Sequence, residues 1–453
     1  MENVSGLISP FFIDNWFPIP LPFKEGSNMA NITRRDALAV GATAATLAAV
    51  GPVHAAGGDK IKVGLIGCGG RGGGAIGDSL RADPSIVFHA AGDVFQDRAK
   101  RVVAGQKEAF GERVDVGDRV FGGLDAFQKV IDSGANLIIL ATPPGFRPTH
   151  LEAAVKAGKH IFCEKPVAVD APGIRKVLEV AKLAKEKKLS IVAGTQRRHQ
   201  QGYIDTIKRI QDGAIGDITA LRCSWNNQGI WFNPRQEGDS DIVYQIKNWY
   251  HFLWLCGDHI TEQHVHNLDV CNWIMGTHPV RAVGIGGRAF RKQGDPNAVG
   301  NIYDHFSVEY QYANGVPMYS YCAHLPNIAN DVSELAIGSK GQSQVNAYQI
   351  KGEKVHGRDP ISAYVQEHKD LIQSIKDGKP YEELTTVAHS TMTAILGRMA
   401  VYSGEVLTWD DALADDRSTM PADLTLDMKH PISGTPYPTT YHVTRKPKAP
   451  KKK

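Results

Sequence analysis

Residues 60–72 read KIKVGLIGCGGRG, an apolar strand pattern that runs directly into a glycine-rich turn. Gly67, Gly69 and Gly72 have the G-x-G-x-x-G spacing of a dinucleotide-binding turn. The first glycine permits the tight turn, the second lets the backbone approach a pyrophosphate, and the third lets the following helix pack against the strand. Free N–H groups and the helix dipole favour phosphate at that helix N-terminus. The stretch therefore predicts the first strand and helix of a dinucleotide-binding domain.

A second strand bears on the choice of cofactor. Residues 86–91 are apolar and end in Gly92-Asp93, close to the position where an acid binds the ribose hydroxyls of a dinucleotide. A carboxylate at Asp93 pairs with those hydroxyls and repels a 2′-phosphate, so NAD is favoured over NADP. Arg98 follows closely and weakens that preference, so NADP stays open.

Two further strands are expected at residues 136–141 and 159–163, with a helix at residues 150–158 between them. The first is an almost uninterrupted apolar run, as a parallel strand covered on both faces should be. Residues 142–144 (TPP) and 164–166 (EKP) follow the two strand ends. The order of elements predicts a doubly wound parallel sheet.

The succession TPP, AGKHIF and CEKP in residues 142–166 resembles the Gfo/Idh/MocA oxidoreductases, a family named for glucose–fructose oxidoreductase and inositol dehydrogenase. The resemblance covers residues 60–409 and implies a Rossmann domain followed by an α+β domain with an open, mostly antiparallel sheet. It also implies that Lys165 lies beside the nicotinamide and the substrate hydroxyl, whereas a lysine at a strand end is otherwise usually solvated. The cofactor contacts it implies are Gly67, Gly69, Gly70, Arg71, Gly72, Asp93, Thr142, Pro143, Glu164 and Lys165.

The second half carries the expected substrate domain. The resemblance makes Gln196 and Arg197 secondary substrate candidates, because relatives have a polar or basic stretch there. Alternating segments predict strands of an open sheet, and two C-terminal helices are expected to complete packing against it. The predicted strands are 218–225, 303–312 and 318–324, and the predicted helices are 172–187, 203–213, 363–375 and 388–402.

A polar segment beginning at residue 257 is expected to form one helix ending at Gly276. Steps of three and four residues then place the polar side chains on one face. Such a stripe is expensive to bury unless it hydrogen-bonds or does chemistry, and histidine has a pKa suited to taking a hydroxyl proton near neutrality. The residues of the stripe are His259, Glu262, His266, Asp269 and Trp273.

The resemblance implies that His266 is the catalytic base, tuned by Glu262, with Asp269 as a further carboxylate near the substrate. Relatives usually have Asp where Glu262 stands, so the identity of the substrate does not transfer. Two alternatives stay open for the helix: a divalent metal site, which lacks a known zinc spacing, and a purely structural buried helix. Trp249 and Tyr250 are candidates for stacking on a sugar ring, with a role in the core as the alternative.

Composition limits the classes of function and partner. The chain has 453 residues and a formal charge of +3, and one Arg and five Lys lie in residues 445–453. The rest is therefore near neutral, which gives no indication of a nucleic-acid groove. The six cysteines are expected to be mostly buried thiols, with one disulfide as a minor alternative. A homo-oligomer is expected from the resemblance.

The N-terminal segment has the pattern of an export signal. Thr33-Arg34-Arg35-Asp36 precedes a short apolar run and a small-residue site at residues 52–56, which indicates a twin-arginine signal and a periplasmic protein without a membrane anchor. Met29 is a plausible start. The predicted division is 1–56 (extension and signal), 57–190 (NAD(P)-binding domain), 191–425 (substrate and oligomerisation domain) and 426–453 (Pro- and Lys-rich tail).

These patterns together predict an oxidoreductase that transfers a hydride between a sugar or polyol hydroxyl and a tightly held nicotinamide cofactor. Two alternatives remain at this point. One is an NAD-dependent enzyme that cleaves a glycoside through transient oxidation of the sugar. The other is a sugar-binding protein that keeps the fold and has lost turnover.

Overall fold

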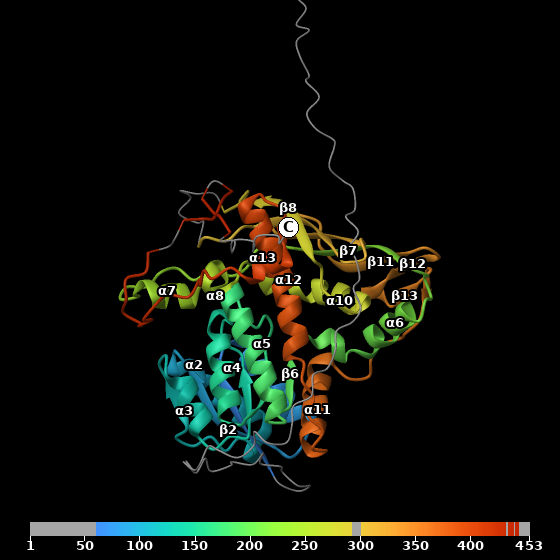
Figure 1. The fold of residues 1–453 in the computed structure, drawn as a ribbon. Coiled ribbons are helices and arrows are strands. Elements are labelled where there is room, and N and C mark those ends of the chain that lie inside the picture. The colour runs from blue at the N-terminus through green and yellow to red at the C-terminus, as the bar shows by residue number, and fades with distance from the viewer. Residues whose placement is uncertain (1–59, 292–299, 432–433, 439, 444–453) are drawn as a thin grey trace, which may run out of the picture. The chain divides into compact units, whose positions relative to one another are not determined.

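The computed structural model describes residues 60–291, 300–431, 434–438 and 440–443. The predicted signal segment and the end of the basic tail lie outside these residues. The N-terminal part is a six-stranded parallel sheet with the strand order β3-β2-β1-β4-β5-β6 (Figure 1). Its strands are β1 (Ile61–Ile66), β2 (Ile86–Asp93), β3 (Val120–Gly122), β4 (Leu137–Leu140), β5 (His160–Cys163) and β6 (Ile191–Ala193).

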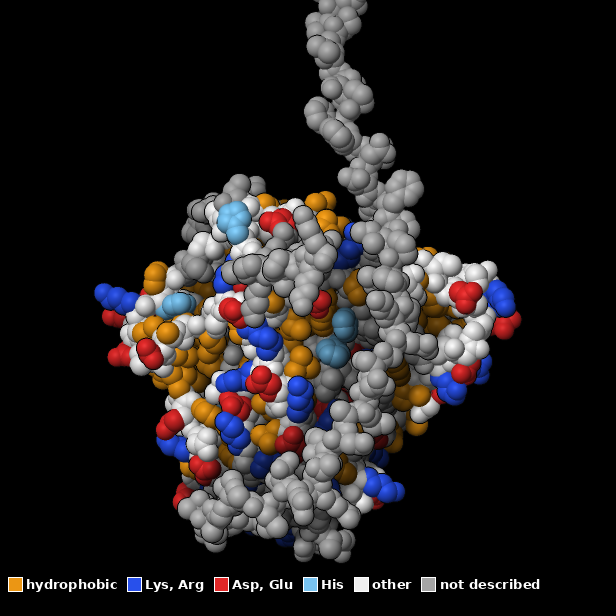
Figure 2. Space-filling view, in the orientation of Figure 1, with side chains coloured by type: hydrophobic (Ala, Val, Ile, Leu, Met, Phe, Trp, Pro, Cys, Tyr) orange, Lys and Arg blue, Asp and Glu red, His pale blue; other side chains and the backbone are white. Residues whose placement is uncertain are grey.

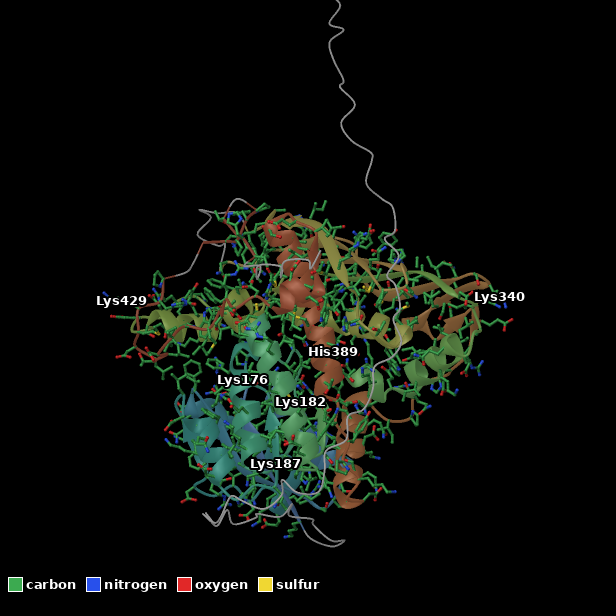
Figure 3. All side chains as sticks on the ribbon, in the orientation of Figure 1. Lys176, Lys182, Lys187, Lys340, His389 and Lys429 are labelled. Atoms are coloured by element: carbon green, nitrogen blue, oxygen red, sulfur yellow. The ribbon has the colours of Figure 1, made fainter. Side chains whose placement is uncertain are left out.

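Helices cover this sheet and leave its carboxyl edge for the loops. The helices are α1 (Gly70–Ala82), α2 (Gln96–Phe110), α3 (Ala126–Asp132), α4 (Arg147–Lys156) and α5 (Ala171–Glu186), with short 3₁₀ turns at Gly111–Arg113 and Pro144–Phe146. The helix α5 shows why they pack as they do. Its inner face buries Ile174, Val177 and Val180, while Lys176 and Lys182 lie along its outer side (Figure 3).

The second part is built on a nine-stranded sheet with the order β14-β13-β12-β11-β7-β10-β9-β8-β15. Strands β7 and β10 pair in parallel, and every other pairing in this sheet is antiparallel. The strands are β7 (Ile218–Asn227), β8 (Arg281–Gly287), β9 (His305–Gln311), β10 (Pro317–His324), β11 (Asp331–Gly338), β12 (Gly341–Gln344), β13 (Gln349–Ile350), β14 (Glu353–Lys354) and β15 (Leu407–Thr408). The predicted fold class is confirmed in both parts.

The helices that follow β6 in the chain pack on the nine-stranded sheet, on one another or on the first domain. They are α6 (Gln201–Gln211), α7 (Asp241–Lys247), α8 (Leu253–Cys256), α9 (His259–Glu262), α10 (Val265–Met275), α11 (Ala363–Lys376), α12 (Leu384–Ser403) and α13 (Trp409–Leu413), with 3₁₀ turns at Gln196–His199, Trp249–His251 and Val345–Ala347. The nearly fully buried α12 packs against β8, β9, α5 and α10.

The helix α11 corrects one expectation. It does not pack on the nine-stranded sheet but returns to the first domain, where it contacts α1, β5 and β6 (Figure 1). The reason is its apolar stripe: Leu371, Ile372 and Ile375 are buried in the same core as Val63 and Phe162 of the parallel sheet. The first domain is therefore completed by residues from near the end of the chain.

The surface over α4 and α5 carries both signs of charge. Figure 2 shows basic and acidic side chains interspersed on this face, without a large field of one sign. Several of them are paired, such as Glu152 with both Lys156 and Lys176, each at 2.7 Å. Such exposed pairs contribute little to stability but keep the face solvated.

Candidate active site

The glycine turn has the geometry that close approach of a dinucleotide requires. Gly67 has φ of +93°, and a Cβ at this position would lie 2.5 Å from the backbone nitrogen of Thr142. A Cβ on Gly72 would lie 1.9 Å from the carbonyl oxygen of Gly67, so only glycine lets α1 pack there. Gly69 and Gly70 have no atom within 4 Å of an added Cβ, so the N-terminus of α1 is open on that side.

A pocket of about 800 Å³ lies over this turn. Gly67, Gly69, Gly70, Arg71, Gly72, Asp93, Thr142 and Pro143 line it, together with Arg98. Of the predicted cofactor contacts, all but Glu164 and Lys165 therefore lie around one pocket. The arrangement fits NAD: backbone N–H groups and a helix N-terminus for the pyrophosphate, and a carboxylate at the neighbouring strand end for the ribose.

Asp93 closes the ribose side of this pocket. Its Oδ2 accepts a hydrogen bond from the Cys68 backbone N–H at 2.7 Å, and its Oδ1 accepts one from Phe95 N–H at 2.9 Å. These bonds fix the carboxylate beside the glycine turn. The Arg98 guanidinium lies 4.5 Å from the centre of the Phe95 ring, at the same end of the pocket.

A buried arginine that sequence reasoning missed organises the strand ends. Arg147, at the start of α4, is 1% exposed. Its guanidinium donates to the carbonyl oxygens of Glu164 and Pro166, each at 2.6 Å, and also to that of Thr142. It thereby ties the loop after β4 to the loop after β5. A basic residue three positions after the TPP motif was the only local signal for it.

Arg71 is held by carboxylates. Its guanidinium pairs with Glu164, with Asp78 at 3.2 Å and with Glu367 of α11 at 3.4 Å. Arg71 lines the pocket over the glycine turn and also a second pocket beside it, and Glu164 lines the second one. Burial raises the pKa of Glu367 well above its ordinary value, and the nearby Glu164 adds to this.

The second pocket, also about 800 Å³, contains the predicted catalytic residues. Lys165, from the loop after β5, and Glu262, at the end of α9, have side chains only 9% and 8% exposed. The Lys165 ammonium lies 3.2 Å from Glu262 Oε1 and also donates to the Glu262 carbonyl oxygen. His266 lines the same pocket and stacks on Trp225, with ring centroids 5.8 Å apart.

Burial gives the two ionisable groups opposite shifts. Burial raises the pKa of Glu262 to about 7, although Lys165 and Arg147 favour its charged form. Burial, together with the charges of Lys165 and Arg197, lowers the pKa of His266 well below its ordinary value. Near neutral pH Glu262 therefore exchanges a proton readily, whereas His266 stays neutral.

The predicted continuous helix is broken. It ends as α9 at Glu262 and resumes as α10 at Val265, so its polar residues do not form one stripe. The break turns Gln263 toward the second pocket, which it lines, and His264 toward β10, where its Nε2 lies 2.8 Å from Ser320 Oγ. Gln263 and His264 thus make contacts in two different directions, and these contacts interrupt the helix that the periodicity predicts.

Two predicted substrate residues have buried protein partners and do not line the pocket. Asp269 is bound by Arg198 through two nitrogens, each at 2.9 Å from a carboxylate oxygen, and by Ser390 Oγ at 2.7 Å. Arg197 donates to Glu334 on β11. Both carboxylates are almost fully buried. The secondary candidate Gln196, by contrast, does line the pocket.

Aromatic side chains form one wall of the second pocket. Trp249 and Tyr250 line it, as predicted, and Trp231 joins them. Trp249 also lines the pocket over the glycine turn, as do Arg71 and Thr142. Tyr250 is buried, and its hydroxyl lies 3.2 Å from Nδ1 of His259. The two pockets thus adjoin and share a wall.

Comparison with known proteins identifies the chain. Residues 61–194 match the family described as "Oxidoreductase family, NAD-binding Rossmann fold", and residues 204–343 match "GFO/IDH/MocA C-terminal domain". The chain belongs to the Gfo/Idh/MocA family. This confirms the predicted family, the NAD-binding Rossmann domain and NAD as the cofactor.

Curated relatives in this family include the inositol 2-dehydrogenase of Klebsiella pneumoniae (strain 342), 28% identical over 222 residues, covering 48% of this chain and 55% of the relative. That of Pseudomonas fluorescens is 31% identical over 167 residues, covering 35% and 43%. The chain therefore spans about half the length of the curated relatives it matches.

Solved structures support the fold. Scyllo-inositol dehydrogenase from Lactobacillus casei, with bound cofactor NAD(H) and scyllo-inositol, aligns with a TM-score of 0.59 and 18% identity, covering 78% of this chain and 100% of that one. An oxidoreductase from Thermotoga maritima aligns with a TM-score of 0.61 and 17% identity, covering 78% and 99%. At this identity the likeness establishes the Gfo/Idh/MocA architecture alone.

Other expectations concern metals, thiols and membranes. Within the described ranges, no group of three or more His, Cys, Asp or Glu side chains is arranged to hold a metal ion. All six cysteines are buried, unpaired thiols, as predicted. In the part of the chain that the structure describes, no helix combines the length and apolar character needed to cross a membrane.

Proposed function

We propose that this protein is an NAD-dependent oxidoreductase that acts on a hydroxyl group of a sugar or polyol. The observation that carries the proposal is the Lys165–Glu262 pair, 3.2 Å apart in a pocket that adjoins the glycine-turn pocket. Oxidation of an alcohol requires, beside the cofactor, a cation near the reacting oxygen and a proton acceptor whose pKa is close to the working pH. Relatives named inositol 2-dehydrogenase support a polyhydroxylated substrate.

NAD, when bound over the glycine turn, supplies the acceptor for the hydrogen removed from the substrate carbon. Glu262 takes the hydroxyl proton, because its pKa of about 7 suits a base near neutrality. Lys165 stabilises the negative charge that develops on the oxygen. His266, whose pKa is low, stays neutral and orients the hydroxyl by hydrogen bonding. This assignment exchanges the roles expected for Glu262 and His266.

The substrate environment is mixed in character. Trp249 and Tyr250 offer ring faces to the apolar C–H faces of a sugar or cyclitol, and Gln196 and Gln263 offer amide groups to its hydroxyls. The Oε1 of Gln196 and the Oε2 of Glu262 have no hydrogen-bond partner among the described residues. A polyhydroxylated ligand satisfies such groups better than an apolar one.

We propose further that a second copy of this chain covers the open face of the nine-stranded sheet. The exposed residues Val283 and Ile285 on β8 and Tyr319 and Tyr321 on β10 lie on that face. An isologous contact buries the same apolar surface on both copies.

We also propose that residues 33–56 direct export of the protein by the twin-arginine route. A cofactor that stays bound would then travel with the folded protein.

The test begins with the cofactor. Purified protein is denatured and released nucleotide is measured by mass spectrometry, for the wild type and for Asp93→Ala. Stoichiometric NAD from the wild type and its loss in the variant support the site. The NAD-loaded protein is then mixed with myo-inositol, scyllo-inositol or a panel of hexoses, and reduction of the bound nicotinamide is monitored by absorbance. Reduction by any of these compounds supports the activity. If the wild type releases no nucleotide and also fails to bind added NAD, the proposal is contradicted.

A further inference from the structure

Trp231 is a large aromatic side chain that the fold leaves open to solvent beside the active site. It lies in the irregular segment between β7 and α7, lines the second pocket and is 44% exposed. Its neighbour Phe232 is equally exposed, at 43%, but is not among the residues that line this pocket. An exposed indole at the rim of a pocket is a candidate contact for a ligand.

Hydrogen bonds hold Trp231 in place. His251 Nε2 lies 2.7 Å from the Trp231 carbonyl oxygen, and Arg291 Nη1 lies 2.6 Å from His251 Nδ1. Because arginine can only donate, His251 Nδ1 accepts and Nε2 carries the hydrogen that Trp231 receives. Burial and the Arg291 charge lower the pKa of His251 to about 4, which keeps this neutral form.

A second set of bonds fixes the same segment two residues further on. Asn233 N–H donates to Asn248 Oδ1 at 2.8 Å, and Asn248 Nδ2 donates to the Asn233 carbonyl at 3.0 Å. Asn248 is fully buried. The backbone of this otherwise irregular segment is thus anchored at Trp231 itself and again at Asn233, which restricts where the indole can lie.

The aromatic wall grades from buried to exposed. Tyr250 is 1% exposed, Trp249 is half-buried and Trp231 is the outermost. The Trp231 centroid lies 5.6 Å from that of Trp249 and 5.7 Å from that of Tyr250, with ring planes at 55° and 77°. At these angles neither ring stacks face to face on Trp231, and with 44% of the residue exposed, part of the indole remains open to a ligand.

The charges around the pocket indicate which ligand fits this wall. Arg71, Arg147 and Lys165 line it against two carboxylates, Glu164 and Glu262. The balance is positive and becomes more so when Glu262 is protonated. An organic cation, which aromatic groups also attract, is therefore disfavoured. A neutral ring with an apolar face, such as a pyranose, matches both the indole and the charge.

We propose that the substrate is a glycoside of at least two rings: the ring that reacts lies against Lys165 and Glu262, and a second, glycosidically linked sugar ring stacks on Trp231. The proposal rests on the function proposed above and extends it to the class of substrate. It also gives a role to an indole that is anchored by its neighbours and is nevertheless exposed.

The test compares disaccharides with their single rings. NAD-loaded protein is titrated by calorimetry with glucose, maltose and cellobiose, and with galactose and lactose. We expect at least one disaccharide to bind roughly tenfold tighter than its monosaccharide, because stacking on one aromatic ring contributes about this factor. Trp231→Ala should remove that preference, because it lowers the affinity for the disaccharide about tenfold more than the affinity for the monosaccharide. Trp231→Phe should restore most of it.

Phe232→Ala is the matched control, since it removes an equally exposed neighbouring ring outside the pocket, and it should keep the preference. Equal binding of disaccharides and monosaccharides by the wild type, including no binding by either, overturns the subsite. So does an undiminished preference in Trp231→Ala. p-Nitrophenyl glucoside tests whether the ring that stacks on Trp231 is a sugar, because its second ring is aromatic. If it binds tighter than maltose and cellobiose, the proposal that the second ring is a sugar is overturned. Failure of the proposed oxidoreductase activity shows separately, as unreduced nicotinamide.

Discussion

The Lys165 ammonium lies 3.2 Å from Glu262 Oε1, and the two residues come from different domains of the chain. Lys165 follows β5 of the parallel sheet, and Glu262 ends α9 of the second part. Burial of both side chains strengthens their interaction and at the same time raises the cost of the carboxylate charge. The pair therefore couples the packing of the two domains to the protonation state of the site.

Replacement of Glu262 by Gln should lower kcat by about 10²–10⁴-fold, the range of a lost general base. In the wild type, activity should rise with pH through about 7, because burial raises the pKa of Glu262 and only the carboxylate formed above it accepts a proton. Lys165 and Arg147 oppose this shift, and Glu164 adds to it. Glu262→Asp should keep this rise of activity with pH. The same rise in Glu262→Gln would contradict the role of Glu262 as the base.

Gly72→Ala should destabilise the protein by about 1–3 kcal/mol and release the cofactor, because the new Cβ would lie 1.9 Å from the Gly67 carbonyl oxygen. Gly73→Ala is the control. Its Cβ would meet Val102 at 3.5 Å, an ordinary contact, and alanine favours the helix by up to about 1 kcal/mol. Thermal unfolding and nucleotide content measure both effects. Equal behaviour of the two variants would refute the steric argument.

Arg147→Lys should cost about 3 kcal/mol, because an ammonium cannot serve three backbone carbonyls in the geometry of the guanidinium. Those carbonyls belong to Thr142, Glu164 and Pro166, so kcat should fall as well. Urea unfolding and steady-state kinetics test this. Arg175→Lys, whose partly exposed guanidinium also binds two carbonyls, should lose less than about 1 kcal/mol.

Asp269→Asn separates a structural role from a substrate contact. Asp269 is 1% exposed and is paired with the half-buried Arg198, and loss of one buried charge costs about 3–5 kcal/mol. We expect reduced stability with an unchanged KM. A raised KM at unchanged stability would instead support the substrate contact suggested by the resemblance. Denaturant unfolding and substrate titration provide the two readings.

Ile285→Glu should shift the assembly toward monomer. Ile285 is 76% exposed on β8, where it and Tyr321 lie opposite Ser307 on either side of β9. A charge in the centre of an apolar self-contact is strongly unfavourable. Light scattering on the eluting protein measures the mass. Val406→Glu, at another exposed apolar position outside the strands, is the control. An equal effect of both substitutions on the mass would contradict self-association through the open face of the nine-stranded sheet.

Local patterns predicted most of the fold. The glycine turn and the parallel strands depend on contacts within a βαβ unit, so Gly67, Gly72 and Asp93 are recognisable from spacing alone. The side chain of Arg147 gave no comparable signal, because its role is defined by three carbonyls that only the folded strand ends bring together. Likewise, Glu367 pairs with Arg71 from almost three hundred residues away.

The polar helix shows where periodicity fails. The three-and-four spacing from His259 to Asp269 predicted one continuous helix and one functional stripe. Tertiary contacts break the helix at Gln263, so Glu262 and His266 line the pocket while Asp269 pairs with Arg198. Periodicity indicates which side chains share a face of a helix. It does not indicate which of them will be bound by a later segment, as Asp269 is by Ser390 of α12.

The return of α11 to the first domain has a consequence for the order in which the protein matures. Leu371, Ile372 and Ile375 complete the core of the parallel sheet, but a ribosome delivers them long after the glycine turn. The nucleotide-binding half consequently remains unfinished until residue 376 has emerged. Synthesis of the second domain therefore comes before completion of the first, and a fragment cut after residue 194 lacks a wall of its own core.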